Sequence, residues 1–126
     1  MVEKMRIQES KMKPFALLTE VAPEKEIWDF YERIKDRNVG VSLNNFILQA
    51  KMVEGKIGGG LIHDYQKVII ALEMNRNYFL DMGFDLDKMT FSQLKQENLY
   101  FLKGIVDCIL GLIKFGEIMK IPELKF

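Results

Sequence analysis

Residues 36–54, DRNVGVSLNNFILQAKMVE, decide the fold, because they carry a helix end, a turn and the start of a second helix. Asn38 or Gly40 can adopt the left-handed conformation that ends a helix. Ser42 is a natural N-cap, since its side chain can accept free backbone N–H groups in the next turn. We therefore predict a tight turn here, followed by a helix whose apolar residues recur at helical spacing: Leu43, Phe46, Ile47, Ala50 and Val53.

The segment before the turn supplies a first helix and, ahead of it, a short apolar run. Apolar side chains at i, i+3, i+4 and i+7 predict a helix over Glu24–Arg37, which follows Pro23. Phe15–Val21, FALLTEV, is largely apolar on both of its alternating faces. Such a run is either a strand buried on both sides or the entry to a helix.

Two longer helices are expected after the glycine run Gly58–Gly60, which is the best candidate boundary in the chain. The first covers Leu61–Met82 and is stopped by a glycine. The second starts at Thr90 and Gln93, which have the spacing of a capping box, and it continues to about Lys120.

This last helix is apolar over most of its circumference. Its charged residues fall near one narrow stripe: Lys103, Asp107, Lys114 and Glu117. Such a helix must be enclosed by its own chain or by a partner. A four-helix monomer of 126 residues has little material for this, so we expect a homodimer or tetramer. The interface residues expected from this helix are Ile105, Ile109 and Leu112.

The composition is that of an ordinary globular protein, with 48% apolar and 29% charged residues. Eighteen basic residues balance 18 acidic ones, so no field of the whole protein attracts DNA or anionic lipid. One cysteine and one histidine exclude a disulfide framework and a zinc finger. We expect a cytoplasmic protein with no membrane partner, no metal site and no cofactor. Because no pattern combines a nucleophile, a base and an orienting residue, we expect no enzyme.

The order of these parts resembles the ribbon-helix-helix family of DNA-binding dimers. The resemblance is carried by the apolar run, by Pro23 and the first helix, and by GVSLNNFI (Gly40–Ile47) with Ala50. It covers about residues 13–54. It implies a mainly α protein in which two copies pair a short N-terminal strand into a β-ribbon, with the helix pairs closing beneath it and two longer helices following.

The resemblance also implies roles for individual residues. The ribbon would lie in the major groove of double-stranded DNA, and the start of the second helix, at Ser42 and Asn44, would contact a phosphate. Neither face of FALLTEV carries the usual readers of base edges, and Glu20 would repel phosphate. Affinity would then depend on a basic arm whose contacts are to phosphates: Lys4, Arg6, Lys11 and Lys13. The dimer core would include Phe15, Leu17, Phe46 and Ile47.

These inferences divide the chain into a basic arm (residues 1–13), a ribbon-helix-helix-like dimerisation and DNA-binding segment (14–55) and a helical oligomerisation segment (56–126). The leading hypothesis is a small oligomeric DNA-binding accessory or regulatory protein, of the repressor or relaxosome type. The alternative is a non-catalytic helical adaptor or assembly subunit that acts through contacts with another protein. The balanced charge and the apolar last helix favour this alternative.

Overall fold

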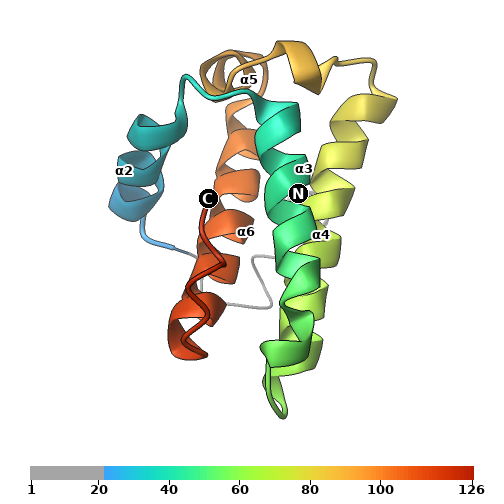
Figure 1. Cartoon of the computed structure of the whole chain (residues 1–126). Helices are drawn as coiled ribbons and strands as arrows, with labels where there is room; N and C mark the ends of the chain where they lie inside the picture. Colours follow the sequence, from blue (N-terminus) through green and yellow to red (C-terminus); the bar gives the residue numbers. More distant parts are fainter. Residues whose placement is uncertain (1–21) are drawn as a thin grey trace, which may run out of the picture.

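A computed structural model describes residues 22–126 of the chain (Figure 1). The first helix of these residues is α2, Glu24–Ile34. It begins directly after Pro23, with two acidic residues near the positive end of its dipole. The predicted apolar stripe is buried: Ile27, Phe30, Tyr31 and Ile34. The helix ends three residues before the predicted Arg37, because the chain turns there toward the start of the next helix.

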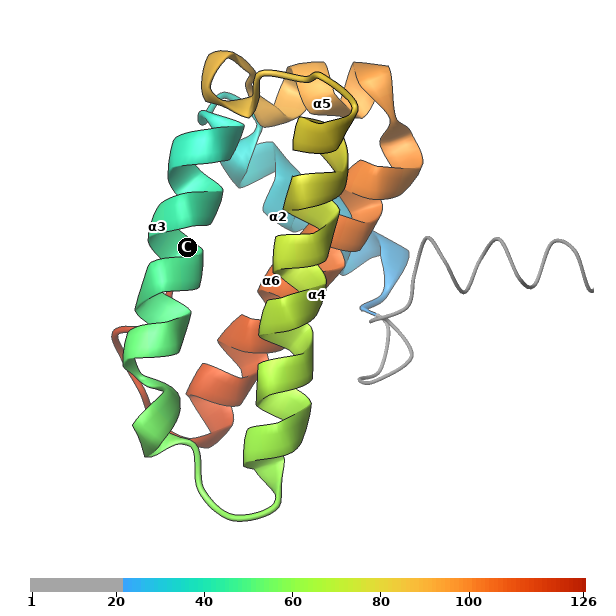
Figure 2. The ribbon, with the colours of Figure 1, turned by 90° about the vertical axis from the view of Figure 1, so that its right-hand side faces the viewer.

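The two helices α3, Val39–Met52, and α4, Leu61–Asp81, run antiparallel and side by side (Figures 1 and 2). A short 3-10 helix, Glu54–Lys56, and the predicted glycine run connect them. Gly59 has a φ of 54°, which glycine adopts without strain. Inside the pair, the Tyr65 hydroxyl donates a hydrogen bond to the Ala50 carbonyl at 2.6 Å. One hydrophobic core runs from α2 to the C-terminal segment across this connection.

The start of α3 differs from the prediction. Its N-cap is Asn38, whose side chain accepts the Val41 N–H at 2.8 Å, and Ser42 lies inside the first turn. Gly40 does not adopt a left-handed conformation. A Cβ there would lie 2.1 Å from Asp87 Oδ1, so glycine is needed for a close approach to the 3-10 helix Leu86–Lys88. Asn38 takes the cap because it also bonds to this neighbouring segment, through Asp87 O.

The predicted last helix is two helices, α5, Phe91–Glu97, and α6, Leu99–Ile118. The capping box at the start of α5 is confirmed, with Thr90 and Gln93 bonding to each other's backbone N–H groups. Asn98 interrupts the predicted single helix. Its backbone is extended, and its side chain accepts the Phe101 N–H at 3.2 Å, so one residue ends α5 and caps α6.

The chain itself encloses α6. This helix packs against α2, α4 and α5, and Ile121 and Leu124 of the C-terminal segment are buried beside it. Its inward side chains are buried, and so are the residues of α3 that the sequence placed in a dimer core. The predicted interface residues of the described chain therefore lie inside one molecule: Phe46, Ile47, Ile105, Ile109 and Leu112. This removes the reason for expecting a partner around α6.

The mainly α fold is confirmed over residues 22–126, where the only β contact is an isolated antiparallel bridge between Asn38 and Thr90. The β-ribbon expected at Phe15–Val21 lies outside the described residues. No helix in the described chain is both long enough and apolar enough to cross a membrane.

Candidate functional site

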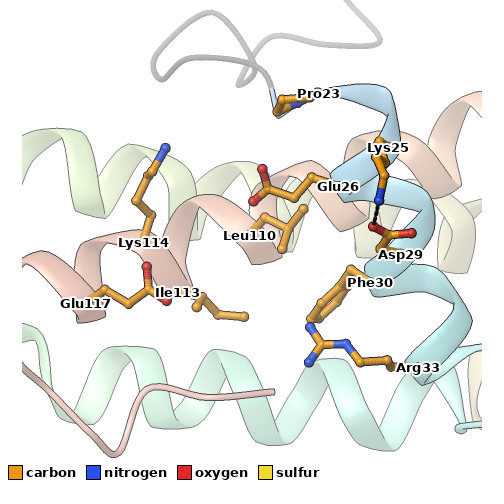
Figure 3. Close-up of a pocket in the computed structure, with 10 residues that line it drawn as sticks. All are labelled: Pro23, Lys25, Glu26, Asp29, Phe30, Arg33, Leu110, Ile113, Lys114 and Glu117. Carbon is orange, nitrogen blue, oxygen red and sulfur yellow. Dashed lines mark hydrogen bonds and ion pairs between the residues drawn. The ribbon is translucent and has the colours of Figure 1, made fainter.

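A groove of about 540 Å³ lies between α2 and α6 (Figure 3). Partly buried side chains of α6, Leu110 and Ile113, lie on one side of it, and the Phe30 ring of α2 lies on the other. Charged residues of both signs surround this apolar floor: Lys25, Glu26, Asp29, Arg33, Lys114 and Glu117.

Several of these charges interact with neighbours in the groove. Lys25 Nζ lies 2.8 Å from Asp29 Oδ2, and this hydrogen bond raises the pKa of Lys25. The Arg33 guanidinium lies 5.0 Å from the centre of the Phe30 ring. Since three basic residues and three acidic ones line the groove, its formal net charge is zero.

Two buried titratable side chains, Tyr65 of α4 and Cys108 of α6, have raised pKa values. Burial and the neighbouring Asp107 raise the pKa of the Cys108 thiol, so the reactive thiolate is disfavoured. Burial raises the pKa of Tyr65 to about 12. Within residues 22–126, no three His, Cys, Asp or Glu side chains are grouped to hold a metal ion.

The outward side of the α3–α4 pair is apolar, and no other element of residues 22–126 covers it. Val41, Leu48 and Met52 are each more than half exposed, and on α3 their spacing of seven and four residues puts them on one stripe. This stripe is opposite the core stripe of the same helix. On α4, Ile70 and Met74 are one turn apart and also more than half exposed. Together these five residues form what we call the α3–α4 face; the two helices that carry it stand in front of α2 and α6 in Figure 2.

Polar contacts join the two helices beside this face. Lys51 Nζ lies 2.6 Å from Glu73 Oε2, and Arg76 Nη1 donates to Asn44 Oδ1 at 2.9 Å. These charges are therefore neutralised or bonded within the molecule. The two contacts also fix how the helices are aligned along their length. Leu48 lies between Asn44 and Lys51 on α3, and Met74 lies between Glu73 and Arg76 on α4. Leu48 and Met74 are consequently at about the same level.

The two DNA-contact candidates in α3, Ser42 and Asn44, lie within the helix rather than at its start. The Ser42 N–H bonds to Asn38 O inside the helix, and the Asn44 side chain is held by Arg76. At the true start of α3, the Val39 N–H bonds to Met89 O and the Asp87 carboxylate lies beside Gly40. The remaining predicted DNA and interface residues lie outside the described residues: Lys4, Arg6, Lys11, Lys13, Phe15 and Leu17.

The sequence contains a signal for the α3–α4 face, but a prediction that looks only for core residues passes over it. Once the core stripe of α3 is assigned, Val41, Leu48 and Met52 are spare apolar residues on its polar side. Comparisons of the chain with protein-family models, with curated proteins and with solved structures give no match.

Proposed function

We propose that the chain is a non-catalytic helical adaptor or assembly subunit, and that it binds another protein through the α3–α4 face. The observation that supports this is the alignment of five exposed large apolar side chains on two adjacent helices. They present roughly 500 Å² of apolar surface, which is near the upper end of what a monomeric protein exposes without a partner.

The chemistry of the face fits a protein partner better than a nucleic acid. The charged side chains beside it have partners within the chain, since Lys51 pairs with Glu73 and Arg76 bonds to the uncharged Asn44. Unpaired charges are depleted at the centre of a protein–protein interface. Met52 and Met74 are flexible and polarisable, which lets such a surface adapt to the shape of a partner. The described residues also carry fourteen basic and fifteen acidic residues, so they supply no attraction for phosphate.

The test compares the proteins that co-purify with an affinity-tagged full chain and with a tagged variant that carries charged residues on the α3–α4 face. We expect the native chain to retain a stoichiometric protein partner and little nucleic acid, and the double variant Leu48→Glu, Met74→Glu to lose that partner. Ile118→Glu is the matched control, because Ile118 is 60% exposed and belongs to α6 rather than to the face. Equal retention by the double variant and the control would contradict the proposal.

The hypothesis of double-stranded DNA binding now depends on the basic arm of residues 4–13, which is outside the described residues. It predicts salt-sensitive retardation of a DNA duplex in a gel, abolished when all four basic residues of the arm are changed to Ala. The face variant Leu48→Glu, Met74→Glu would leave such binding unchanged, so the two functions can be separated in one set of proteins.

A further inference from the structure

We propose that the partner on the α3–α4 face is a second copy of this chain, packed antiparallel about a two-fold axis that passes beside Leu48 and Met74. This proposal rests on the proposed function and names the partner. The axis lies in the plane between the two copies and is perpendicular to the helices. Each α4 then packs on the partner's α4, and each α3 on the partner's α3, as a four-helix bundle.

The outward stripe of α4 is self-complementary about Met74. Lys67 lies seven residues before it and Asp81 seven residues after it, with opposite charges. Ile70 and Tyr78 lie four residues before and after it, and both are exposed. An antiparallel two-fold axis at Met74 therefore places Lys67 opposite the partner's Asp81, and Ile70 opposite the partner's Tyr78.

The charged residues at the two ends of this stripe are Lys67 and Asp81. Within the described chain neither of them forms an ion pair. The Tyr78 ring stacks on Phe101 at a centroid distance of 4.6 Å, which fixes its orientation while 46% of the residue stays exposed. A rigid aromatic ring with one covered face is typical of interface anchors.

The same axis suits α3. Because Leu48 and Met74 are at about the same level, an axis at Met74 also brings Leu48 against the partner's Leu48. Val41 and Met52 lie on either side of this contact along the stripe. The centre of the bundle would hold two leucines and two methionines, with apolar residues above and below them.

The area of the face suits a second copy. In the middle of the face the Lys51–Glu73 pair is neutral, while Arg76 keeps its positive charge and is held at the side by the uncharged Asn44. The roughly 500 Å² of apolar surface, with the polar rim added, approaches the ~800 Å² per partner of a standard interface.

Cysteine cross-linking tests the axis. Leu48→Cys and Met74→Cys would each place two thiols close together across the two-fold axis, and mild oxidation with copper phenanthroline and oxygen should give a covalent dimer in each case. The native Cys108 is buried and does not compete. Ile118→Cys is the control and should stay monomeric. Dimers from Ile118→Cys alone, or none from the two face positions, would overturn the proposal.

A charge exchange tests the register. Lys67→Glu puts two acidic residues opposite each other at both ends of the interface, so we expect the dissociation constant from sedimentation equilibrium to rise roughly tenfold. Adding Asp81→Lys in the same chain restores both pairs and should restore the affinity. No rescue by the double variant would overturn the antiparallel register. Since both residues are exposed, neither change should unfold the chain.

A photo-cross-linking residue at position 48 separates failure of this inference from failure of the proposed function. In the cell of origin, a cross-link to the same chain supports self-association. A cross-link to a different protein, with a native chain that is monomeric at high micromolar concentration, overturns self-association and leaves the adaptor role standing. Absence of any protein cross-link would overturn both.

Discussion

The helices α6 and α3 are both rich in apolar residues, but they differ in what covers them. In α6 the side chains of Leu102, Ile105 and Leu112 are completely buried within the single chain. In α3 the stripe formed by Val41, Leu48 and Met52 is exposed, and no element of the described chain lies over it. The more apolar helix, α6, is thus covered by other elements of the described chain, whereas the outward stripe of α3 is not.

This difference shows that the need for a partner follows from coverage and not from apolar content. The short α5 and the C-terminal segment supply side chains that fill the space around α6: Phe91, Leu94, Ile121, Leu124 and Phe126. These elements are small, and from the sequence alone they do not look capable of enclosing a long helix. The elements that the structure describes leave the outward side of α3 and α4 exposed.

A matched pair of leucine substitutions tests the comparison most strongly. Leu102→Ala removes a side chain with no solvent exposure from α6, and we expect it to lower the free energy of unfolding by about 3 kcal/mol through loss of burial and a cavity. Leu48→Ala removes a side chain that is 59% exposed, and we expect a change within about 0.5 kcal/mol. Urea unfolding at low protein concentration, where copies stay apart, measures both. Equal losses would mean that the outward side of α3 is covered.

A matched pair of glycine substitutions tests the packing at the start of α3. In Gly40→Ala the new methyl group would meet Asp87 Oδ1 at 2.1 Å and the backbone of Leu86 and Asp87 at 3.0 Å, so the 3-10 helix must move. We expect a loss of about 1–3 kcal/mol in the free energy of unfolding. Gly55→Ala is the control, because nothing lies within 4 Å of the added carbon, and it should change stability by less than about 0.5 kcal/mol. A neutral Gly40→Ala would contradict the close approach.

The sequence predicts those features that depend on neighbours along the chain. The core stripe of α2 and the capping box at Thr90 follow from spacing alone, and both are as predicted. A feature that depends on a distant segment is missed: Gly40 is predicted as a turn glycine, whereas the 3-10 helix Leu86–Lys88 packs against it. The helix break at Asn98 is missed although its cap is local, since its side chain accepts the Phe101 N–H three residues on.

The candidate site shows the same limit. Its residues lie on the outward side of α3 and α4, where apolar residues break the expected pattern but form no motif. Only the alignment of two helices, set by contacts such as Lys51–Glu73, brings the two stripes together into one face. That alignment joins residues 22 positions apart in the chain, and local spacing carries no information about it.

The choice between Ser42 and Asn38 as the cap of α3 can be measured directly. Asn38→Ala removes the acceptor of the Val41 N–H and the donor to Asp87 O, and we expect it to lower the free energy of unfolding by about 1 kcal/mol. Ser42→Ala changes a residue inside the helix and should have an effect within about 0.5 kcal/mol. Chemical denaturation measures the loss of stability in both variants. A larger loss for Ser42→Ala than for Asn38→Ala would mean that Ser42 is the cap of α3.

The smallest expected effect concerns pH and the interior of the α3–α4 pair. Burial, helped by the Glu54 carboxylate, raises the pKa of Tyr65 from its ordinary value of 10.0 to about 12. Between these values the unfolded chain loses the phenolic proton first, so the free energy of unfolding falls as the pH rises above 10 and levels off above 12. At pH 10.5 this contribution is less than about 1 kcal/mol, and it vanishes at neutral pH.

Tyr65→Phe isolates this effect, although the buried Cys108 thiol contributes a slope of the same sign in every variant. The variant loses the hydrogen bond to Ala50 O, so at neutral pH it should be less stable than the native chain by about 1 kcal/mol. Above pH 10 that difference should narrow, because only the native chain has the Tyr65 phenol to ionise on unfolding. Tyr78→Phe, at an exposed tyrosine, is the control and should follow the native curve at low protein concentration. If the difference in the free energy of unfolding between Tyr65→Phe and the native chain stayed constant above pH 10, folding would not raise the pKa of Tyr65. Solvent would then reach the Tyr65 hydroxyl, and the inward side of the α3–α4 pair would not be closed.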